Sequence, residues 1–352
     1  MTFLNKIKNF IKRAYLLNHF PSVVQIIFSR KKNIIYYGFL GDGNFGDELV
    51  FEATKELFKD NLVIPFQRHM PIVTKVYCKM FPNSIHGIII GGGTLIRGFN
   101  ADKNYYKNLV NKGKPVFFHG TGTDKNLLDT EFWESFIQQK KYGGVRGPLS
   151  IQYLKKNNFN FKEIGDAALF LERNSENIIK KKEIIINFGT HKPDAELLRS
   201  RNEIIKFLKS IKDKNYKLIY LPLHSIDLEL GNILKEEINE LKVLDIAESY
   251  KDTLKLIAEA EFCIGERLHF NVMNILANTN FISINYDNKH VDFLKSLDLE
   301  AYGYFPKDIN CELIQSIFEN TDQLINWLEV NDKVDELKTK QKSEKTLFLE
   351  NA

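Results

Sequence analysis

Short apolar runs rich in β-branched residues recur along this chain and alternate with segments whose apolar residues follow helical spacing. This alternation predicts β-α-β units built around mostly parallel sheets. In the first half of the chain the predicted strands are 34–39, 62–66, 87–90, 115–119 and 143–146. In the second half they are 183–188, 217–223, 242–246, 262–264 and 281–286.

A polar, lysine-rich segment, residues 173–182, separates the two groups of strands and indicates an interdomain linker. At 352 residues the chain is also long for a single hydrophobic core. We therefore expect an α/β protein with two Rossmann-like domains facing a cleft. Its expected segments are a basic arm (1–33), an N-terminal domain (34–176), a C-terminal domain (177–306) and a helical tail (307–352) with a fraying end.

Composition narrows the class of protein. Hydrophobic residues at 43% and charged residues at 27% are ordinary for a soluble globular enzyme. Cys78, Cys263 and Cys311 are widely spaced and form no Cys-x-x-Cys pair. This argues against a disulfide framework or a zinc site and favours a reducing, cytoplasmic location.

The net charge of +4 is unevenly distributed, because residues 1–32 carry seven cations and no acid, which leaves −3 on the rest. Apolar residues of this arm follow helical spacing, so it could form an amphipathic helix. Two interpretations stay open: peripheral contact with the inner face of the cytoplasmic membrane, or packing on the protein. Loss of binding to anionic vesicles on removal of residues 1–32 would favour the first. The apolar runs are too short for a membrane span, and the acidic body argues against nucleic acid.

A glycine-rich loop follows the first strand, with the sequence Gly41-Asp-Gly43-Asn44-Phe-Gly46-Asp47-Glu48. Such a loop lets the backbone turn sharply and present N–H groups to an anion or a polar substrate. An NAD site would also need an acid after the second strand, where residues 67–69 are Gln, Arg and His, so only a weak NADP interpretation survives. Asp47 and Glu48 either favour the helix dipole or contact a substrate.

Three further strand ends carry candidate residues. Gly91, Gly92 and Gly93 allow either the close approach of a ligand or tight packing. His119 either faces the cleft or is hydrogen-bonded beneath a loop. Arg146 is either a structural cation or a bidentate anion clamp.

Arg267 and His269 stand where the strand 262–264 gives way to its helix, and Lys289 follows the strand 281–286. Loops at the carboxyl ends of neighbouring parallel strands form the ligand crevice of an open α/β sheet. We therefore expect these three residues to form one anion site.

Taken together and in this order, these segments resemble the polysaccharide pyruvyl transferase family. The family shows Gly-Asn-x-Gly-Asp-Glu, Gly-Gly-Gly, Val-Arg-Asp-x-x-Ser, Gly-Arg-Leu-His and Tyr-Asp-x-Lys segments. The matching segments here are 43–48, 91–93, 145–150, 266–269 and 286–289, and the resemblance spans about residues 34–297. Gly147, Glu266 and Phe270 depart from the pattern; the first costs a local cap, and the other two border the expected anion site.

The resemblance implies a fold like the two-domain (GT-B-like) glycosyltransferases. It also implies transfer of a pyruvyl group from phosphoenolpyruvate to two hydroxyls of a sugar in a cell-surface polysaccharide or its lipid-linked precursor, forming a cyclic ketal and releasing phosphate. Phosphoenolpyruvate is a co-substrate, and no cofactor or metal is expected. The expected donor-binding residues are Arg146, Arg267, Leu268, His269 and Lys289.

His269 is the first candidate for proton transfer, because an unperturbed histidine titrates near neutral pH, with phosphate binding as the alternative. Asn44, Asp47, Glu48 and His119 are the expected acceptor contacts, and Asp47 would hold or deprotonate sugar hydroxyls. One alternative is a GT-B-type glycosyltransferase that uses a nucleotide sugar. Against it, the second predicted domain shows no carboxylate pair that would hold the nucleotide ribose and the donor sugar. The other is a non-catalytic family member that acts as an assembly partner at the membrane surface. Such a protein ought to have lost the cationic residues of the anion site, and this sequence keeps them.

Overall fold

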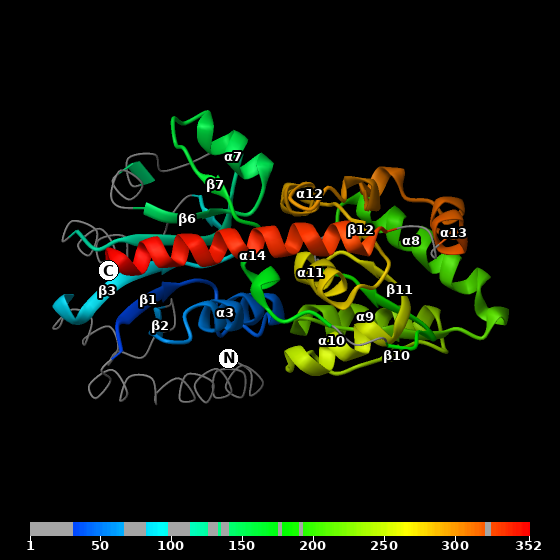
Figure 1. The fold of residues 1–352 in the computed structure, drawn as a ribbon. Helices are drawn as coiled ribbons and strands as arrows, with labels where there is room; N and C mark the ends of the chain where they lie inside the picture. Colours follow the sequence, from blue (N-terminus) through cyan, green and yellow to red (C-terminus); the bar gives the residue numbers. More distant parts are fainter. Residues whose placement is uncertain are drawn as a thin grey trace, which may run out of the picture. The chain divides into compact units, whose positions relative to one another are not determined.

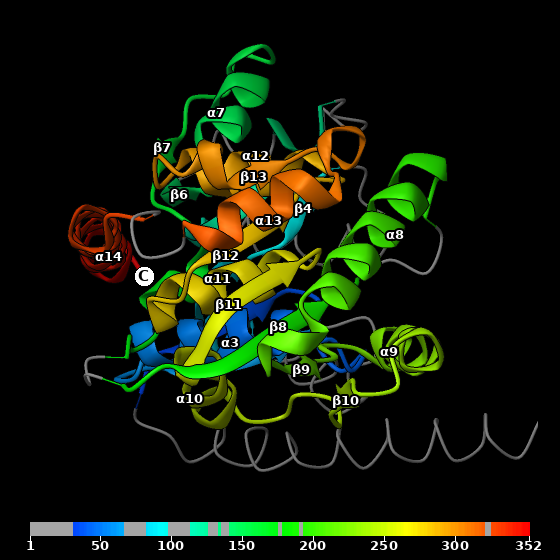
Figure 2. The same cartoon turned by 90° about the vertical axis from the view of Figure 1, so that its right-hand side faces the viewer.

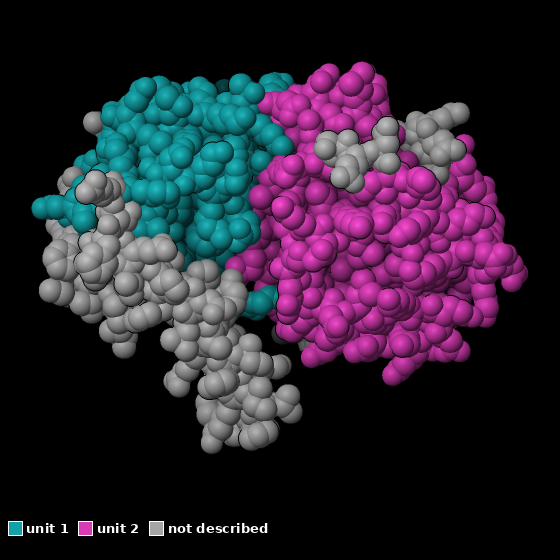
Figure 3. All heavy atoms as spheres, turned by 60° about the horizontal axis from the view of Figure 1, so that its bottom comes forward, with its two compact units in different colours: residues 1–43, 50–170, 336–352 teal, residues 44–49, 171–335 magenta. Residues whose placement is uncertain are grey.

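The computed structural model describes residues 31–66, 82–97, 113–125, 133–134, 141–174, 178–189, 193–320 and 325–352 (Figure 1). The chain divides into two compact units, coloured in Figure 3. Unit 1 comprises residues 1–43, 50–170 and 336–352, and unit 2 comprises residues 44–49 and 171–335. Residues 1–30 of the basic arm and residues 67–69 lie outside the described residues, so the membrane and NADP interpretations stay predictions.

Unit 1 is built on a parallel sheet, in which the described residues form seven strands. Their order is β2 (Leu62–Phe66), β1 (Asn33–Tyr37), β3 (Ile85–Ile90), β5 (Val116–Thr123), β6 (Lys141–Val145) and β7 (Lys162–Glu163), with β4 (Thr94–Ile96) paired to β5. Helices of this unit include α3 (Phe45–Leu57) and α7 (Pro148–Lys155). The first turn of α3 belongs to unit 2. Ile88, Ile89 and Ile90 are all buried. Burial on both faces explains why these strands are continuously apolar rather than alternating.

Unit 2 is built on a second parallel sheet, with six strands among the described residues. Their order is β10 (Lys242–Val243), β9 (Lys217–Tyr220), β8 (Lys181–Asn187), β11 (Ala260–Gly265), β12 (Phe281–Ile284) and β13 (Gly303–Tyr304). The helices are α8 (Ala195–Ser210), α9 (Ser225–Glu237), α10 (Tyr250–Glu259), α11 (Leu268–Ala277), α12 (Asn288–Lys295), α13 (Cys311–Glu319) and the start of α14 (Trp327–Glu350).

Helices cover both faces of the unit 2 sheet (Figure 2). Ile184 and Ile186 of β8 pack in one core cluster with Phe207 of α8, Leu234 of α9 and Phe318 of α13. Helices α10 and α11 pack against each other and against β11. The predicted strands thus lie in two parallel sheets, and the strands that were not predicted, β4, β7 and β13, have only two or three residues each.

Helix α14 contradicts the expected solvated, fraying tail. It runs from Trp327 to Glu350, and a stripe along it is buried, namely Val330, Val334, Leu337, Gln341, Glu344 and Phe348. In unit 1 Glu344 accepts the Gly143 N–H (3.0 Å), and Lys32 Nζ donates to the Leu349 carbonyl (2.8 Å). The stripe was missed because two of its six members are polar. No helix in the described ranges is both long and apolar enough to cross a membrane.

Candidate functional site

The cationic residues of unit 2 lie at one edge of its sheet. Strands β11 and β12 are parallel neighbours, with Gly265 opposite Ser283, so both strands end at the same edge. Arg267 is the N-cap residue of α11, directly after β11. Lys289 lies in the first turn of α12, where its N–H donates to the Asp287 side chain (3.0 Å). The Lys289 ammonium stands 5.3 Å from the centroid of the Tyr286 ring.

Asp227 holds the Arg267 side chain in place. Arg267 Nε donates to both carboxylate oxygens (3.1 and 3.0 Å), and Nη2 donates to Oδ1 (2.5 Å). The carboxylate is fully buried and also accepts the Leu223 N–H (3.0 Å). The carboxylate partner raises the pKa of Arg267, although burial alone would lower it. Sequence reasoning missed Asp227, because an acid in the first turn of α9 has an ordinary role beside the helix dipole.

The first turn of α3 packs against His269 within unit 2. A Cβ atom built on Gly46 would lie only 2.2 Å from Nδ1 of His269, so glycine is what allows the imidazole to approach this turn. The Phe45 N–H also donates to the Leu223 carbonyl (2.9 Å). His269 itself is 9% exposed. The glycine-rich loop and the histidine, 223 positions apart in the sequence, therefore form one assembly.

Asp47 is held in this turn and has an unusual acidity. Asn44 Nδ2 donates to Asp47 Oδ2 (2.7 Å), and Asn44 Oδ1 accepts the Gly46 N–H (3.1 Å). Desolvation raises the pKa of Asp47 to about 7, and Glu48 adds to the rise, while Asn44, Arg267 and Lys289 oppose it. Asp47 was expected in the N-terminal domain, opposite the cations. It belongs instead to unit 2, because the first turn of α3 packs on that unit's strand ends.

Two of the expected ligand contacts lie in the interior of unit 1. His119 is fully buried, with Nδ1 bonded to Thr54 Oγ1 (2.9 Å) and Nε2 to Gln341 Oε1 (3.2 Å). Burial lowers the pKa of His119 to about 4. His119 is therefore a buried, hydrogen-bonded histidine, the second of its two interpretations from the sequence. The expectation that it contacts the sugar acceptor is not met.

Arg146 is likewise a structural cation. It is 1% exposed; its Nε donates to Asp166 Oδ2 (2.9 Å) and its Nη2 to the Gly93 carbonyl (2.9 Å). An arginine enclosed in this way has its charge compensated inside unit 1. The expectation of a donor clamp at Arg146 is therefore corrected, because the buried carboxylate of Asp166 takes the place of the ligand.

The glycines of the second cluster are explained by packing. A Cβ atom on Gly91 would lie 2.2 Å from the Tyr36 hydroxyl, and one on Gly92 would lie 2.8 Å from Val50 Cγ1. Gly93 has φ of +81°, a backbone conformation that favours glycine. Gly43 differs, since it has φ of +73° and a Cβ atom there would meet nothing within 4 Å among the described residues.

The three departures from the family pattern are structural. Gly147 caps α7 without a side-chain hydrogen bond, which is the local cost expected from the missing aspartate. Glu266 is fully buried, where Arg201 grips it through Nε (2.7 Å) and Nη2 (2.6 Å). Phe270 is fully buried against Gly265. Glu266 and Phe270 are therefore buried structural residues beside Arg267 and His269.

Comparisons with known proteins agree with this architecture. The UDP-N-acetylglucosamine 2-epimerase from Rickettsia bellii is 12% identical with a TM-score of 0.53, covering 91% of this chain and 97% of that one. The UDP-GlcNAc 2-epimerase from Neisseria meningitidis, bound to UDP-GlcNAc, is 10% identical with a TM-score of 0.53, covering 91% and 100%. At these identities the likeness concerns the fold alone. With the two parallel sheets, it confirms the predicted α/β class of two Rossmann-like, GT-B-like domains.

The small ribosomal subunit protein uS3 of Rickettsia canadensis (strain McKiel) is 31% identical over 117 residues, which are 32% of this chain. The match covers 50% of the length of that curated relative. The family model for polysaccharide pyruvyl transferase matches residues 44–288, most of the chain. The chain belongs to the polysaccharide pyruvyl transferase family.

Proposed function

We propose that this protein transfers the pyruvyl group of phosphoenolpyruvate to two hydroxyls of one sugar, in a cell-surface polysaccharide or its lipid-linked precursor. The products are a cyclic ketal and inorganic phosphate. One observation carries the proposal: a carboxyl group whose desolvation raises its pKa to about 7, Asp47, adjoins the Gly46–His269 contact and feels the charges of Arg267 and Lys289. A carboxyl with a raised pKa, a histidine and two cations thus occur together in unit 2, which supports the proposal.

The donor suits the cations of this edge. Phosphoenolpyruvate carries roughly three negative charges, from its carboxylate and its nearly doubly ionised phosphate. Arg267 uses Nε and Nη2 for Asp227, and among the described residues Nη1 has no acceptor, so Nη1 is the donor proposed for the phosphate. Lys289 supplies a second charge. The N-terminus of α11, beginning at Leu268, adds partial positive charge and backbone donors.

The chemistry needs one proton on carbon and the removal of two hydroxyl protons. Protonation of the methylene carbon makes C2 cation-like, and the first sugar hydroxyl forms a C–O bond there. The C2–O bond to phosphate then breaks, and the second hydroxyl attacks C2 to close the ring. Of the two hydroxyl protons, one balances the proton placed on the new methyl group and the other leaves with phosphate.

We assign proton delivery to His269 and proton removal to Asp47. The imidazole packs against the turn that carries Asp47, so a substrate at this edge would meet both groups. A base is most effective when its pKa is near the working pH, which the raised pKa of Asp47 provides. Asn44, whose amide donates to Asp47, would orient the carboxylate toward the hydroxyl.

Titration of phosphoenolpyruvate into an Arg267→Ala protein tests the donor site. The variant removes a charge-assisted contact worth roughly 1.5–3 kcal/mol, so the dissociation constant should rise about tenfold or more. Because Arg267→Ala strands the buried Asp227 carboxylate, the double variant Arg267→Ala/Asp227→Asn is measured beside it.

Arg199→Ala is the matched control, since Arg199 is an exposed arginine of the same unit that donates to the Pro306 carbonyl (3.3 Å). It should bind donor like the parent protein. Unchanged donor affinity in the folded double variant would remove Arg267 from the site.

A further inference from the structure

His290 is a fully buried histidine that follows Lys289 in the first turn of α12. Its Nε2 atom lies 2.7 Å from the backbone carbonyl oxygen of Glu266, and its Nδ1 atom lies 3.1 Å from that of Asp287. Burial lowers the pKa of His290, and the charge of Lys289 lowers it further, so the ring is neutral near pH 7 and carries a single N–H. This N–H belongs on Nε2, because the Asp287 carbonyl already accepts the His290 backbone N–H (3.1 Å).

Glu266, which accepts this hydrogen bond, is fixed to the end of β8. Its N–H donates to the Asn187 carbonyl (2.9 Å), and its Oε2 accepts the Gly189 N–H (2.7 Å). The next N–H along the chain, that of Arg267, donates to Asn187 Oδ1 (3.2 Å). The backbone from which Arg267 projects is therefore held by the neighbouring strand, and His290 attaches α12 to the same point.

The hydrogen bond from His290 thus spans the two segments that carry the cations of unit 2. Arg267 directly follows Glu266 in the chain, and Lys289 directly precedes His290. The charges of Arg267 and Lys289 both lower the pKa of Asp47, which places the two cations near one carboxyl group. The bond joins residues 24 positions apart, so it fixes the spacing of the two backbone positions rather than a local turn.

Tyr286 completes the contacts of this segment. Its ring centroid lies 4.8 Å from that of His290, and the Lys289 ammonium stands 5.3 Å from the same tyrosine ring. An apolar side chain could pack against Tyr286 without the cost of burying a polar ring. The histidine is therefore explained by its hydrogen bond and not by packing alone.

We propose that His290 is a positioning residue that holds Lys289 at a fixed distance from Arg267, so that one ligand with two anionic groups is bound by both cations. This rests on the proposed function, in which phosphoenolpyruvate presents a phosphate and a carboxylate. When the spacing is fixed before binding, the second contact costs little further ordering. His290 is buried and acts only through Lys289, and it selects phosphoenolpyruvate over a phosphate ester that lacks the carboxylate.

Calorimetric titration of the full-length protein with phosphoenolpyruvate and with methyl phosphate measures this selection. The parent protein should bind phosphoenolpyruvate about tenfold or more tightly than methyl phosphate. His290→Asn, whose amide replaces Nδ1, and His290→Met, which fills the space without a donor, should lose about tenfold in affinity for phosphoenolpyruvate and little for methyl phosphate. His290→Gln, whose amide nitrogen replaces Nε2, should keep most of the selection.

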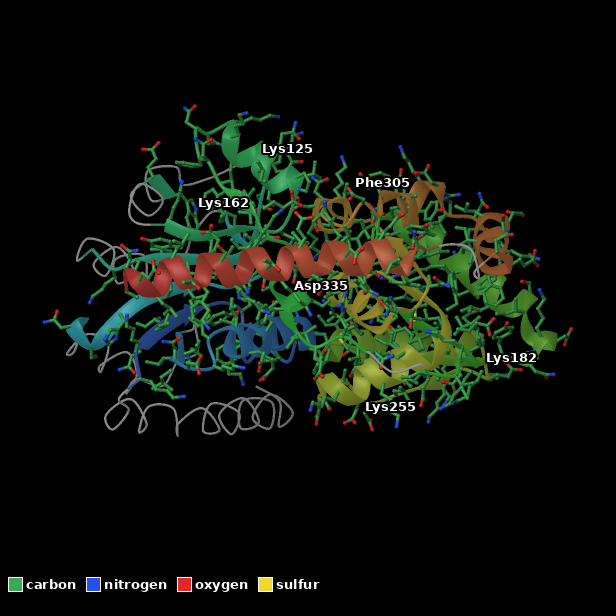
Figure 4. The ribbon with its side chains drawn as sticks, in the orientation of Figure 1. Lys125, Lys162, Lys182, Lys255, Phe305 and Asp335 are labelled. Atoms are coloured by element: carbon green, nitrogen blue, oxygen red, sulfur yellow. The ribbon has the colours of Figure 1, made fainter. Side chains whose placement is uncertain are left out.

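Two further variants show whether His290 acts through Lys289. Lys289→Ala should show the same loss as His290→Asn, and the double variant should lose no more than Lys289→Ala alone, because two residues that serve one contact are not additive. Lys255→Ala is the matched control, since Lys255 is an exposed lysine of α10 in the same unit (Figure 4). It should leave both affinities unchanged.

The outcomes separate this inference from the proposed function. Selection retained in a folded His290→Asn or His290→Met protein would overturn the inference and leave the proposed donor intact. Equal losses for the two ligands, or losses that add in the double variant, would make His290 a structural residue. Loss of selection in a folded His290→Gln protein would also overturn the inference, which keeps the test decisive if the other two variants do not fold. If the parent protein binds both ligands alike, the inference and the proposed donor both fail.

Discussion

Replacement of His269 by asparagine should lower turnover by about 10²–10⁴ while the affinity for phosphoenolpyruvate falls much less. The reason is that asparagine can donate a hydrogen bond to phosphate but cannot deliver a proton to carbon. Single-turnover kinetics and donor titration, done on the same preparation, separate the two effects. Gly46→Ala is the companion variant, since its Cβ would lie 2.2 Å from His269 Nδ1 and displace the ring without removing it.

Proportional losses of turnover and donor affinity in His269→Asn would assign His269 to phosphate binding alone. The acid would then have to be another group at this edge. Normal turnover in a folded Gly46→Ala protein would show that the position of the imidazole is unimportant.

Replacement of Asp47 by asparagine should remove both activity and its pH dependence. Desolvation raises the pKa of Asp47 to about 7, so its carboxylate, the proposed base, is mostly protonated below that pH and ionised above it. In the parent protein the rate should rise with pH through about 7. Asp47→Asn should be slower by about 10²–10⁴ and lack this limb, whereas Asp42→Asn, an exposed acid of the same loop, should keep it.

The same variant has a readout that does not depend on activity. A carboxyl whose pKa is raised on folding binds its proton more tightly in the folded state. Its contribution to stability is fully present below pH 3.8, the ordinary pKa of an aspartate, and is lost as the pH rises to about 7. Asp47→Asn should therefore be at least as stable as the parent above pH 7. If denaturant unfolding shows a large loss of stability there instead, Asp47 is a structural residue.

Hydrophobic pattern predicted much of this fold for a physical reason. Strands buried on both faces must be apolar at successive positions, so runs such as those of β3 and β11 stand out in the sequence. Adjacent strand ends then allowed Arg267 and Lys289 to be grouped before their geometry was known. The chain passes from unit 1 to unit 2 between Phe170 and Leu171.

The polar contacts could not be predicted, because they join residues far apart in the chain. Nothing in the sequence links Asp227 to Arg267, or Arg201 to Glu266. His119 and Arg146 were predicted to bind ligands because each is a polar residue at the end of a strand. The sequence does not reveal the distant residue that hydrogen-bonds each side chain in the interior. Their partners, Gln341 and Asp166, stand 222 and 20 positions away.

The central claim is pyruvyl transfer, and the direct measurement is phosphate release from phosphoenolpyruvate in the presence of a panel of sugar diols. The account predicts release that depends on the right diol and equals, one for one, the cyclic ketal found on that sugar by NMR. No release with any diol, together with transfer of a sugar from a uridine or guanosine diphosphate donor, would contradict it and make the protein a glycosyltransferase.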